Sequence, residues 1–383
     1  MKIVIAPDSL KECLSAPDAA EAIARGVRRA APEAEIVAVP IADGGEGTVD
    51  TLVEATGGEY RECEAPDPLG RPVEAEWGLS GDGRTAFIEM ARASGLELVS
   101  PDERDPLQAS TAGTGRMIAE ALEEGARKFI VGIGGSATVD GGTGMAHALG
   151  VRFVDAEGHV IDRPCGGRLA DIAKIDMSGL SPLVSEATIE VACDVTNPLT
   201  GPEGAARIYG PQKGATPEQV EELEAGLAHL AEMIRRWLDK DVEHLAGAGA
   251  AGGLGAGLVA FLDAELRRGV ETVLDAVHID DALEGAAVAF TAEGAADAQS
   301  AFGKATAGVA QRAKKHGVPC VLLAGSLGAG WQKVYQAGLT AAFALADGPL
   351  GLSEAMRRAE ELLADRAEAA VRLWLVRCKR RIN

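Results

Sequence analysis

The sequence predicts an α/β protein built from two different α/β domains. One is expected to be an open, mostly parallel sheet of the Rossmann or flavodoxin type, and the other a mixed-sheet α/β domain inserted into it. The chain opens with two strand–loop–helix units, and the same parallel pattern returns near residue 287. The residues between them alternate in hydrophobicity, as hairpin strands do. The predicted domains are therefore 1–60 plus 285–383, and the insertion 61–284.

The two opening units place polar residues directly after buried strands. The first strand covers 2–6 and is followed by P-D-S-L-K, and a helix then starts at Ser15 with a proline in its first turn. The second strand, 36–39, leads through a glycine-rich loop to a helix over 49–55. Ligands of open parallel sheets bind at the carboxyl ends of the strands, so Ser9 and Lys11 are candidates for binding substrate or phosphate.

The inserted domain shows hairpin and helix signals in turn. Residues 59–63 and 73–79 alternate around a proline- and glycine-rich turn, which predicts an antiparallel pair. A second hairpin is expected within 151–161, and the T-P-E-Q sequence at 216–219 is a capping box that starts a helix to about residue 238. The parallel pattern resumes with predicted strands at 287–291, 319–324 and 340–345.

Composition excludes several classes of function. The 383 residues carry a net charge of −21, which argues against a nucleic-acid partner because phosphates need a basic surface. The six cysteines are scattered without a C-x-x-C pair and indicate reduced thiols in a cytoplasmic protein. The histidines form no cluster with zinc-ligand spacing. The uncharged stretch 245–262 has the length of a membrane span, but its glycine content favours a close-packed internal turn and helix.

The stretch 129–150 is the most informative part of the chain. Its apolar start predicts a buried strand, the glycines after it predict a loop rich in backbone N–H donors, and 145–149 resembles a helix. We predict that this loop binds a phosphate or a substrate oxyanion, because bare backbone and a helix N-terminus both favour anions. The predicted binding residues of the loop are Gly134, Gly135, Ser136 and Asp140.

Two other interpretations of these glycines stay open. Residues 132–137 fit the G-x-G-x-x-A dinucleotide fingerprint, with Asp155 after the next strand-like run, which would make a nicotinamide site. Against this, Gly141 and Gly142 fall where the first turns of the pyrophosphate-binding helix would be, and glycine is costly there. The remaining alternative is a purely structural glycine corner.

The pattern D-G-G-x-G occurs twice, at 43–47 and at 140–144, each time before a helix-like segment. Each loop therefore offers a carboxylate beside backbone donors. The predicted binding residues of the first loop are Gly44, Gly45, Glu46, Gly47 and Thr48. A strand at 189–193 is followed by D-V-T-N, and the loop 210–215 carries one cation. We predict that Asn197 and Lys213 join the same binding site.

Seven stretches, taken in order, carry a resemblance to a known family. They are IAPDSLKECLSA (5–16), PIADGGEGT (40–48), GIGGSATVDGGTGMAHALG (132–150), ACDVTNPLTGPEGAA (192–206), GPQKGAT (210–216), GAGAAGGLGAGL (247–258) and EGAADAQSAFGK (293–304). Together they resemble the bacterial glycerate kinase family, of the type related to glycerate 2-kinases. The resemblance implies ATP and a divalent metal, D-glycerate as substrate, and phosphoglycerate, usually the 2-phosphate, as product. It also implies two different α/β domains with the active site in the cleft between them.

The residues after the strands suit phosphoryl transfer, which needs charge neutralisation, metal ligands and a positioned hydroxyl. The chain has no G-x-x-x-x-G-K-[ST] sequence, so it is not a P-loop kinase. The predicted catalytic residues are Asp194, Asp43 and Lys11. Lys304 is a further predicted phosphate-binding cation, and Glu293 and Asp297 are the predicted ligands of Mg²⁺.

The chain departs from the family at 291–297. Family members usually read T-G-E-G-R-hydrophobic-D there, and this chain has Ala292, Ala295 and Ala296 instead. We expect the strand to end at Thr291. An alanine at 292 would then strain the loop if that position needs positive φ. The missing arginine removes a fixed cation that would otherwise hold a phosphate or a carboxylate.

The leading hypothesis is ATP-dependent phosphorylation of D-glycerate by a cytoplasmic monomer or homodimer, with no nucleic-acid or membrane partner. Two alternatives come from other classes. One is a nicotinamide-dependent oxidoreductase that uses the loop 132–137. The other is a catalytically impaired relative that only binds a small hydroxy acid, which the alanines at 292–296 suggest.

Overall fold

The computed structural model describes residues 1–10, 13–42, 44–45, 47–298, 300 and 305–379. The chain folds into two compact units. Unit 1 combines Met1–Asp43 with Val273–Asn383, and unit 2 is the segment Gly44–Thr272 inserted between them. These bounds differ from the predicted domains at both junctions. One reason is that helix α2 (Thr48–Thr56) packs against strands of unit 2, whereas the sequence placed it with the first domain.

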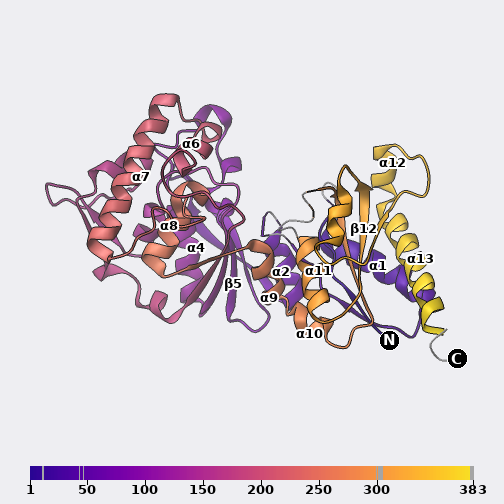
Figure 1. Ribbon diagram of the computed structural model, residues 1–383. Coiled ribbons are helices and arrows are strands. Elements are labelled where there is room, and N and C mark those ends of the chain that lie inside the picture. Colours follow the sequence, from indigo (N-terminus) through magenta and orange to yellow (C-terminus); the bar gives the residue numbers. More distant parts are fainter. Residues whose placement is uncertain (11–12, 43, 46, 299, 301–304, 380–383) are drawn as a thin grey trace. The chain divides into compact units, whose positions relative to one another are not determined.

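Unit 1 is built on a five-stranded parallel sheet (Figure 1). Its strands are β1 (Lys2–Ile5), β2 (Glu35–Ala38), β11 (Val288–Ala296), β12 (Cys320–Leu327) and β13 (Ala341–Ala344). They lie in the order β13-β12-β11-β1-β2, with parallel pairing throughout. Within the unit this is the flavodoxin-type order, in which the direction of strand addition reverses between β1 and β11. The predicted open parallel sheet is confirmed.

Unit 1 also contains helices. They are α1 (Ala16–Ala30), α10 (Ile279–Leu283), α11 (Ala305–Lys315), α12 (Leu352–Arg357) and α13 (Ala359–Lys379), with α9 (Gly269–Ala276) at the junction and the 3-10 helix η7 (Trp331–Tyr335). Of these, α1, α11 and α13 contact the sheet of the unit. Helices α1 and α13 lie side by side (Figure 1). A Cβ atom on Gly26 would lie 2.0 Å from the carbonyl oxygen of Ala364, so only glycine permits this approach. The predicted start of α1 is also confirmed, because Ser15 accepts a hydrogen bond from the Asp18 N–H at 3.2 Å.

Strand β11 is longer than the sequence indicated. The prediction ended it at Thr291, but β11 continues to Ala296 and pairs Ala292 with Leu323 and Ala295 with Ser326 of β12. Ala292 is completely buried and does not have positive φ. The expectation of a strained loop at this alanine is therefore wrong. The local sequence lacks β-branched residues there, so the extension depends on pairing with β12, which a single segment does not reveal.

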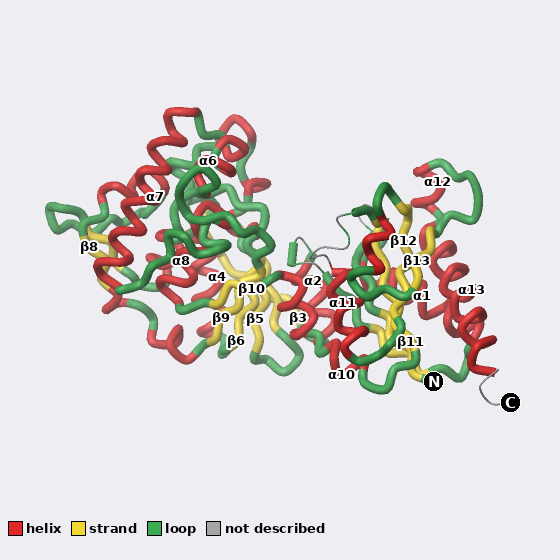
Figure 2. The backbone as a smooth tube through the Cα atoms, viewed as in Figure 1, coloured by secondary structure: helices red, strands yellow, loops and turns green. Residues whose placement is uncertain are grey.

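Unit 2 contains a six-stranded mixed sheet (Figure 2). Its strands are β3 (Glu59–Pro66), β4 (Pro72–Leu79), β5 (Thr85–Glu89), β6 (Lys128–Gly132), β9 (Thr188–Ala192) and β10 (Glu265–Arg267), in the order β10-β9-β6-β5-β4-β3. The predicted hairpin is confirmed as the antiparallel pair β3–β4, and the strands from β5 to β10 are parallel. The hairpin expected within 151–161 is only partly formed. Strand β7 (Arg152–Val154) pairs with β8 (Lys174–Asp176), and a single bridge joins Val154 to Val160.

The two faces of this sheet carry different helices. Helix α2 packs on one face, where a Cβ atom on Gly78 would lie 2.3 Å from Val53 Cγ2. Trp77 points to the opposite face, as alternation requires, and joins the large core of the unit. The helices besides α2 are α3 (Ala91–Ser94), α4 (Ala112–Glu123), α5 (Thr143–Ala148), α6 (Ala205–Tyr209), α7 (Pro217–Leu238) and α8 (Ala250–Leu262). The short 3-10 helices are η1 (Leu96–Leu98), η2 (Pro101–Glu103), η3 (Gly166–Asp171), η4 (Met177–Gly179), η5 (Pro182–Glu186) and η6 (Pro211–Lys213). The predicted capping box at the start of α7 is confirmed.

The glycine-rich stretch 245–262 forms a tight turn into α8. The first residues of the helix, 251–253, have left-handed backbone angles rather than helical ones. A Cβ atom on Gly252 would lie 1.9 Å from the carbonyl oxygen of Thr138, and the Gly252 carbonyl accepts the N–H of Gly141 at 3.1 Å. These glycines therefore bring α8 against the predicted binding loop. Within the described part of the chain, no helix has the length and apolar character needed to cross a membrane.

Candidate active site

Three neighbouring strands of unit 2 end at the same edge of the sheet. Glu89 of β5, Gly132 of β6 and Ala192 of β9 lie next to one another in register. The segments that follow β6 and β9 carry the predicted residues 134–136 and Asp194. Since ligands of parallel sheets bind at the carboxyl ends of strands, this edge is the candidate site in unit 2.

The loop 134–136 offers unused backbone donors at this edge. Gly134 and Gly135 are exposed, and Gly135 has φ of 71°. Two backbone hydrogen bonds join the loop to the segment 94–96: the Gly135 carbonyl accepts the Leu96 N–H at 2.8 Å, and the Ala137 N–H donates to the Ser94 carbonyl at 3.0 Å. The N–H groups of residues 134, 135 and 136 have no acceptor among the residues that the structure describes. This arrangement suits an oxyanion, and the binding of an oxyanion by this loop stays a prediction.

Lys213 lies beneath this loop and does not reach solvent. Its side chain extends from η6, the residue is only 2% exposed, and its Nζ atom donates to Ser136 Oγ and to the Thr138 carbonyl, both at 2.7 Å. Burial lowers the pKa of Lys213 to about 7, although the nearby Asp140 opposes this shift. Lys213 was predicted to bind phosphate. The structure places its ammonium group behind Ser136, so Lys213 would not contact a ligand bound at the loop directly.

Asp140 organises the second half of the loop. It is completely buried, and its carboxylate accepts hydrogen bonds from Thr111 N and Oγ1, both at 2.8 Å, from Gly142 N at 3.1 Å and from Gly144 N at 3.2 Å. Burial raises the pKa of Asp140. Four donors and no acceptor nevertheless favour the ionised form. Helix α5 starts here, so the anion at its N-terminus is Asp140 itself. The sequence predicted that a ligand would bind at that N-terminus.

A carboxylate of the protein also lies at the start of α2, the helix that follows the first D-G-G-x-G loop. Gly47 precedes α2 with φ of 81° and provides no side-chain cap. Glu89 supplies the cap instead, because its Oε1 atom accepts the Val49 N–H at 3.2 Å. Glu89 is 8% exposed, burial raises its pKa, and Arg92 lies 3.5 Å from its Oε2 atom.

Two other predicted residues of this loop, Thr48 and Gly44, pack within unit 2. Thr48 Oγ1 donates to the Gly45 carbonyl at 2.6 Å. Gly44 has φ of 92°, and a Cβ atom on it would lie 2.6 Å from the Cα atom of Gly269. Glycine is therefore required at position 44 for both its backbone angle and its close approach to α9.

The segment after β9 carries Asp194 and Asn197, two of the predicted site residues. Asp194 is exposed, and its Oδ1 atom accepts the Gly269 N–H at 3.0 Å. Asn197 is half-buried: its Nδ2 donates to the Glu203 carbonyl and its Oδ1 accepts the Tyr209 hydroxyl, both at 2.8 Å. Asp194 thus suits a role in chemistry, while the Asn197 side chain holds the following loop in place.

The carboxyl ends of β1 and β11 define the corresponding edge in unit 1. The Asp8 N–H donates to the Ala292 carbonyl at 2.9 Å, so the loop with Ser9 follows β11 closely at the point where strand order reverses. Glu293 is 7% exposed and accepts the hydroxyl groups of Ser300 at 3.1 Å and Thr306 at 3.2 Å. Among the described residues, no three His, Cys, Asp or Glu side chains gather closely enough to hold a metal. Asp297 is half-buried near the same strand end.

Four predicted site residues lie outside the residues that the structure describes. Their proposed roles therefore stay predictions. They are Lys11, Asp43, Glu46 and Lys304.

Comparison with known proteins identifies the family. Residues 3–375 match the model of the glycerate kinase family. The chain belongs to the glycerate kinase family. Kinases transfer phosphoryl groups, so membership makes the chain a phosphotransferase.

Three relatives show how far this family likeness extends. The chain is 50% identical to a glycerate kinase of Halalkalibacterium halodurans over 374 residues, which are 97% of this chain and 98% of the relative. It is 51% identical to the glycerate 2-kinase of Escherichia coli over 359 residues, 94% of each chain. A crystal structure of a Salmonella typhimurium LT2 protein assigned to glycerate kinase 2 superposes with a TM-score of 0.91 at 49% identity, covering 99% of both chains.

Within this glycerate kinase family member, the dinucleotide interpretation of residues 132–137 does not fit the backbone. The fingerprint needs a helix that opens directly behind its glycines. Here the first helix after β6 is α5, which begins only at Thr143. The N–H groups at that helix start bind the carboxylate of Asp140, as described above. A nicotinamide cofactor would find no helix terminus at this loop.

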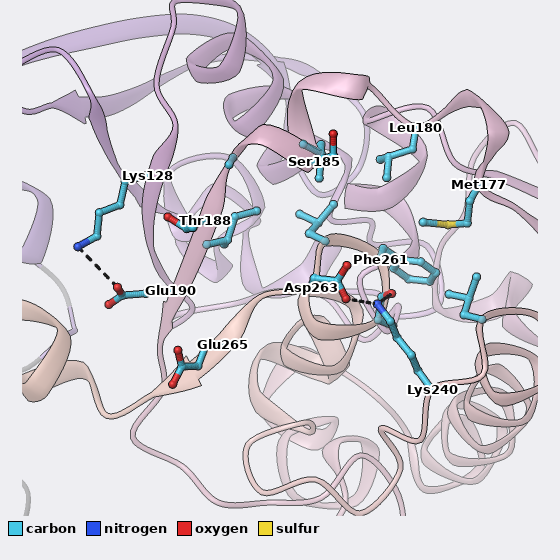
Figure 3. A pocket seen from close by; sticks show the side chains of 16 residues that line it. Lys128, Met177, Leu180, Ser185, Thr188, Glu190, Lys240, Phe261, Asp263 and Glu265 are labelled. Atoms are coloured by element: carbon cyan, nitrogen blue, oxygen red, sulfur yellow. Dashed lines mark hydrogen bonds and ion pairs between the residues drawn. The ribbon is translucent and has the colours of Figure 1, made fainter.

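A pocket of about 740 Å³ lies at the other edge of the unit 2 sheet (Figure 3). It is bordered by the first residues of β6, β9 and β10 and has an apolar floor that includes Phe261. Its two lysines are already paired, Lys128 with Glu190 at 3.6 Å and Lys240 with Asp263 at 2.5 Å. None of the predicted site residues lines this pocket. It gives no support for a second active site.

Sequence reasoning missed Glu89, the carboxylate that caps α2. Glu89 is the last residue of β5, T-A-F-I-E. Its one charged residue stands at the carboxyl end of an otherwise apolar strand, and that position was the available signal. Its partner Val49 lies 40 residues away in the sequence, so the contact itself could not be foreseen.

Proposed function

We propose that this member of the glycerate kinase family transfers the γ-phosphoryl group of ATP to the 2-hydroxyl of D-glycerate, giving 2-phosphoglycerate and ADP. Relatives named glycerate kinase and glycerate 2-kinase, about half identical over nearly the whole chain, support the substrate and the position. The structural observation that carries the proposal is the loop 134–136. Its unbonded N–H groups and the cation behind it suit the anionic groups of glycerate or ATP.

The roles of the side chains follow from phosphoryl-transfer chemistry, which depends on positioning and charge neutralisation. Asp194 is an exposed carboxylate at the carboxyl end of β9, next to β6 and its loop. We assign it the role of general base, which takes the proton from the glycerate hydroxyl as that oxygen attacks the γ-phosphorus. The bond to the β-phosphate oxygen breaks at the same time, and ADP leaves with that electron pair. Asp43 and Lys11 remain proposed catalytic residues on sequence grounds.

A divalent cation supplies charge neutralisation on the phosphates in this proposal. Mg²⁺ usually takes one or two protein carboxylates and completes its shell with water and phosphate oxygens. Glu293 and Asp297 have the right donor chemistry at the end of β11. Both oxygens of Glu293 accept hydroxyl hydrogen bonds, which hold its carboxylate in place at this strand end.

A coupled assay of ADP release tests the proposal. We expect ATP turnover that depends on D-glycerate and on Mg²⁺, and Asp194→Asn should lower kcat by about a hundredfold or more because general-base catalysis contributes on that scale. Absence of D-glycerate-dependent ADP release would contradict the proposal. Binding of D-glycerate without turnover would instead favour the catalytically impaired relative. Glycerate-dependent reduction of a nicotinamide cofactor would favour the oxidoreductase.

A further inference from the structure

Lys213 is the one buried cation that the described structure places directly behind the candidate loop. Its Nζ atom bridges Ser136 Oγ and the Thr138 carbonyl, two atoms near the carboxyl end of β6. The residue is 2% exposed, and Ser136 is 7% exposed. A ligand at the loop would therefore meet Ser136 and the backbone rather than the lysine.

The direction of the Lys213–Ser136 hydrogen bond determines whether the Ser136 hydroxyl can donate to a ligand. An ammonium group only donates, so Ser136 Oγ must act as the acceptor. The hydroxyl hydrogen of Ser136 is then available for a further acceptor, and none is found among the described residues. Together with the N–H groups of residues 134–136, it makes a set of donors backed by a positive charge.

We infer that Lys213 is a positioning residue. Its ammonium group holds Ser136 so that the Ser136 hydroxyl and the loop N–H groups bind a small oxyanion of a substrate. The oxyanion is either the carboxylate of the hydroxy acid or a phosphate of the nucleotide. This inference rests on the proposed function and adds to it that Lys213 acts through Ser136 without touching the ligand.

The same geometry makes the loop sensitive to the protonation of Lys213. A neutral amine would accept the Ser136 hydrogen instead, which removes that donor from the ligand, and the positive charge behind the loop would disappear. Burial lowers the pKa of Lys213 to about 7, so this reversal of the Lys213–Ser136 hydrogen bond should occur near neutral pH. A bound oxyanion favours the ammonium form and raises this pKa. Oxyanion binding should therefore weaken as the pH rises above 7.

Other ionisable groups near Lys213 are few. Asp140, on the loop after β6, acts on it electrostatically and favours its charged form. Arg104 lies against Gly214, the residue after the lysine. Cys165 lies near Asp140, and burial, followed by the charge of that aspartate, raises the pKa of its thiol. Four donated hydrogen bonds favour the ionised form of Asp140, and the raised pKa of Cys165 keeps its thiol neutral. Lys213 is therefore the group expected to titrate near neutral pH.

Kinetic comparison of four full-length variants tests the inference: Lys213→Met, Ser136→Ala, the double variant, and Lys240→Met. Lys240 is the matched control, because its Nζ atom also donates to backbone carbonyls but lies in the pocket at the other edge of the sheet (Figure 3). We expect Lys213→Met and Ser136→Ala each to raise the KM for one substrate by about tenfold to a hundredfold, with a smaller change in kcat. A higher KM for D-glycerate identifies the carboxylate as the bound oxyanion, and a higher KM for ATP identifies the phosphate.

The KM of the double variant should equal that of Lys213→Met, because both substitutions remove the same donor, the Ser136 hydroxyl held by Lys213. In the wild type that KM should rise between pH 7 and 8. The rise should be smaller in Ser136→Ala, which keeps only the change of charge behind the loop, and absent in Lys213→Met, which has no titrating amine. Independent, multiplying effects of the two substitutions, or the full wild-type pH dependence retained in Lys213→Met, would overturn the inference. An unchanged KM in Ser136→Ala would also overturn the inference. This variant keeps the buried lysine, so it provides the test even if Lys213→Met does not fold.

Calorimetric titration with D-glycerate and with ATP distinguishes failure of the proposed function from failure of the inference about Lys213. If the wild type binds D-glycerate or ATP but makes no phosphoglycerate, the proposed function fails. The inference then stands or falls on whether Ser136→Ala weakens that binding. If the wild type is active and both substitutions leave binding of both substrates unchanged, the inference alone fails.

Discussion

Replacement of Asp140 tests whether this residue holds the fold of the loop or serves a ligand. The carboxylate accepts four hydrogen bonds, from Thr111 N and Oγ1 and from the N–H groups of Gly142 and Gly144. Hydrogen bonds to a charged group contribute about 1.5–3 kcal/mol each. The carboxylate also costs several kcal/mol to bury, which offsets much of their sum. We therefore expect Asp140→Ala to lower the free energy of unfolding by about 3–5 kcal/mol, the usual cost of removing one member of a buried charged network.

Denaturant unfolding measures this loss directly. The midpoint should fall while the m-value stays constant, because the surface exposed on unfolding changes little. Asp82→Ala is the matched control. Asp82 accepts the Ser80 hydroxyl at 2.6 Å and the Arg84 N–H at 3.0 Å in an exposed turn of the same unit, and its loss should cost only about 1 kcal/mol. A loss below about 1 kcal/mol for Asp140→Ala, with strongly impaired substrate binding, would refute the structural role and restore the ligand-binding one.

Three further substitutions have defined outcomes. Glu89→Ala should destabilise the protein by about 1–2 kcal/mol in denaturant unfolding, because α2 loses its cap, whereas Glu89→Gln should recover most of this. Arg312→Ala should cost about 3 kcal/mol, because Arg312 is buried between two aspartates of unit 1. Burial alone would raise the pKa of Asp280, but hydrogen bonds from His316 and Arg312 lower it. The stabilisation by ionised Asp280 is therefore present above about pH 4, the ordinary range of a carboxyl, and fades as the pH falls through its lowered pKa. In Arg312→Ala the fading should be smaller, because His316 alone still lowers this pKa, and a pH titration of stability with the full wild-type fading would contradict this. Ala295→Arg should raise kcat/KM about tenfold to a hundredfold if the exposed end of β11 meets the substrates, and unchanged kinetics would remove Glu293 and Asp297 from the site.

The features predicted correctly from sequence are those encoded by local patterns. Buried strands followed by polar residues predicted the parallel sheet of unit 1, and alternation predicted the β3–β4 hairpin. The capping box of α7 was also visible, because its residues are close neighbours in the chain. The glycine loop after β6 was predicted as a set of free N–H donors, and residues 134–136 have that character.

The features missed depend on contacts between distant segments. No local pattern indicates that Glu89 caps α2, or that the carboxylate of Asp140 lies at the start of α5. Both helix termini resembled anion sites in isolation, and both hold a carboxylate of the protein itself. The continuation of β11 through Ala296 likewise depends on pairing with β12, since alanine and glycine have little strand preference of their own.

The most direct test of the proposed reaction is the ³¹P NMR spectrum of ATP incubated with the protein, Mg²⁺ and D-glycerate. We expect the γ-phosphate signal to disappear as ADP and one new phosphomonoester signal form together. That signal should be a doublet, because the phosphorus of 2-phosphoglycerate couples to one methine proton. A triplet would place the phosphate on the terminal CH₂ oxygen and contradict the assigned position. Release of inorganic phosphate alone, or no consumption of ATP, would contradict phosphoryl transfer to glycerate.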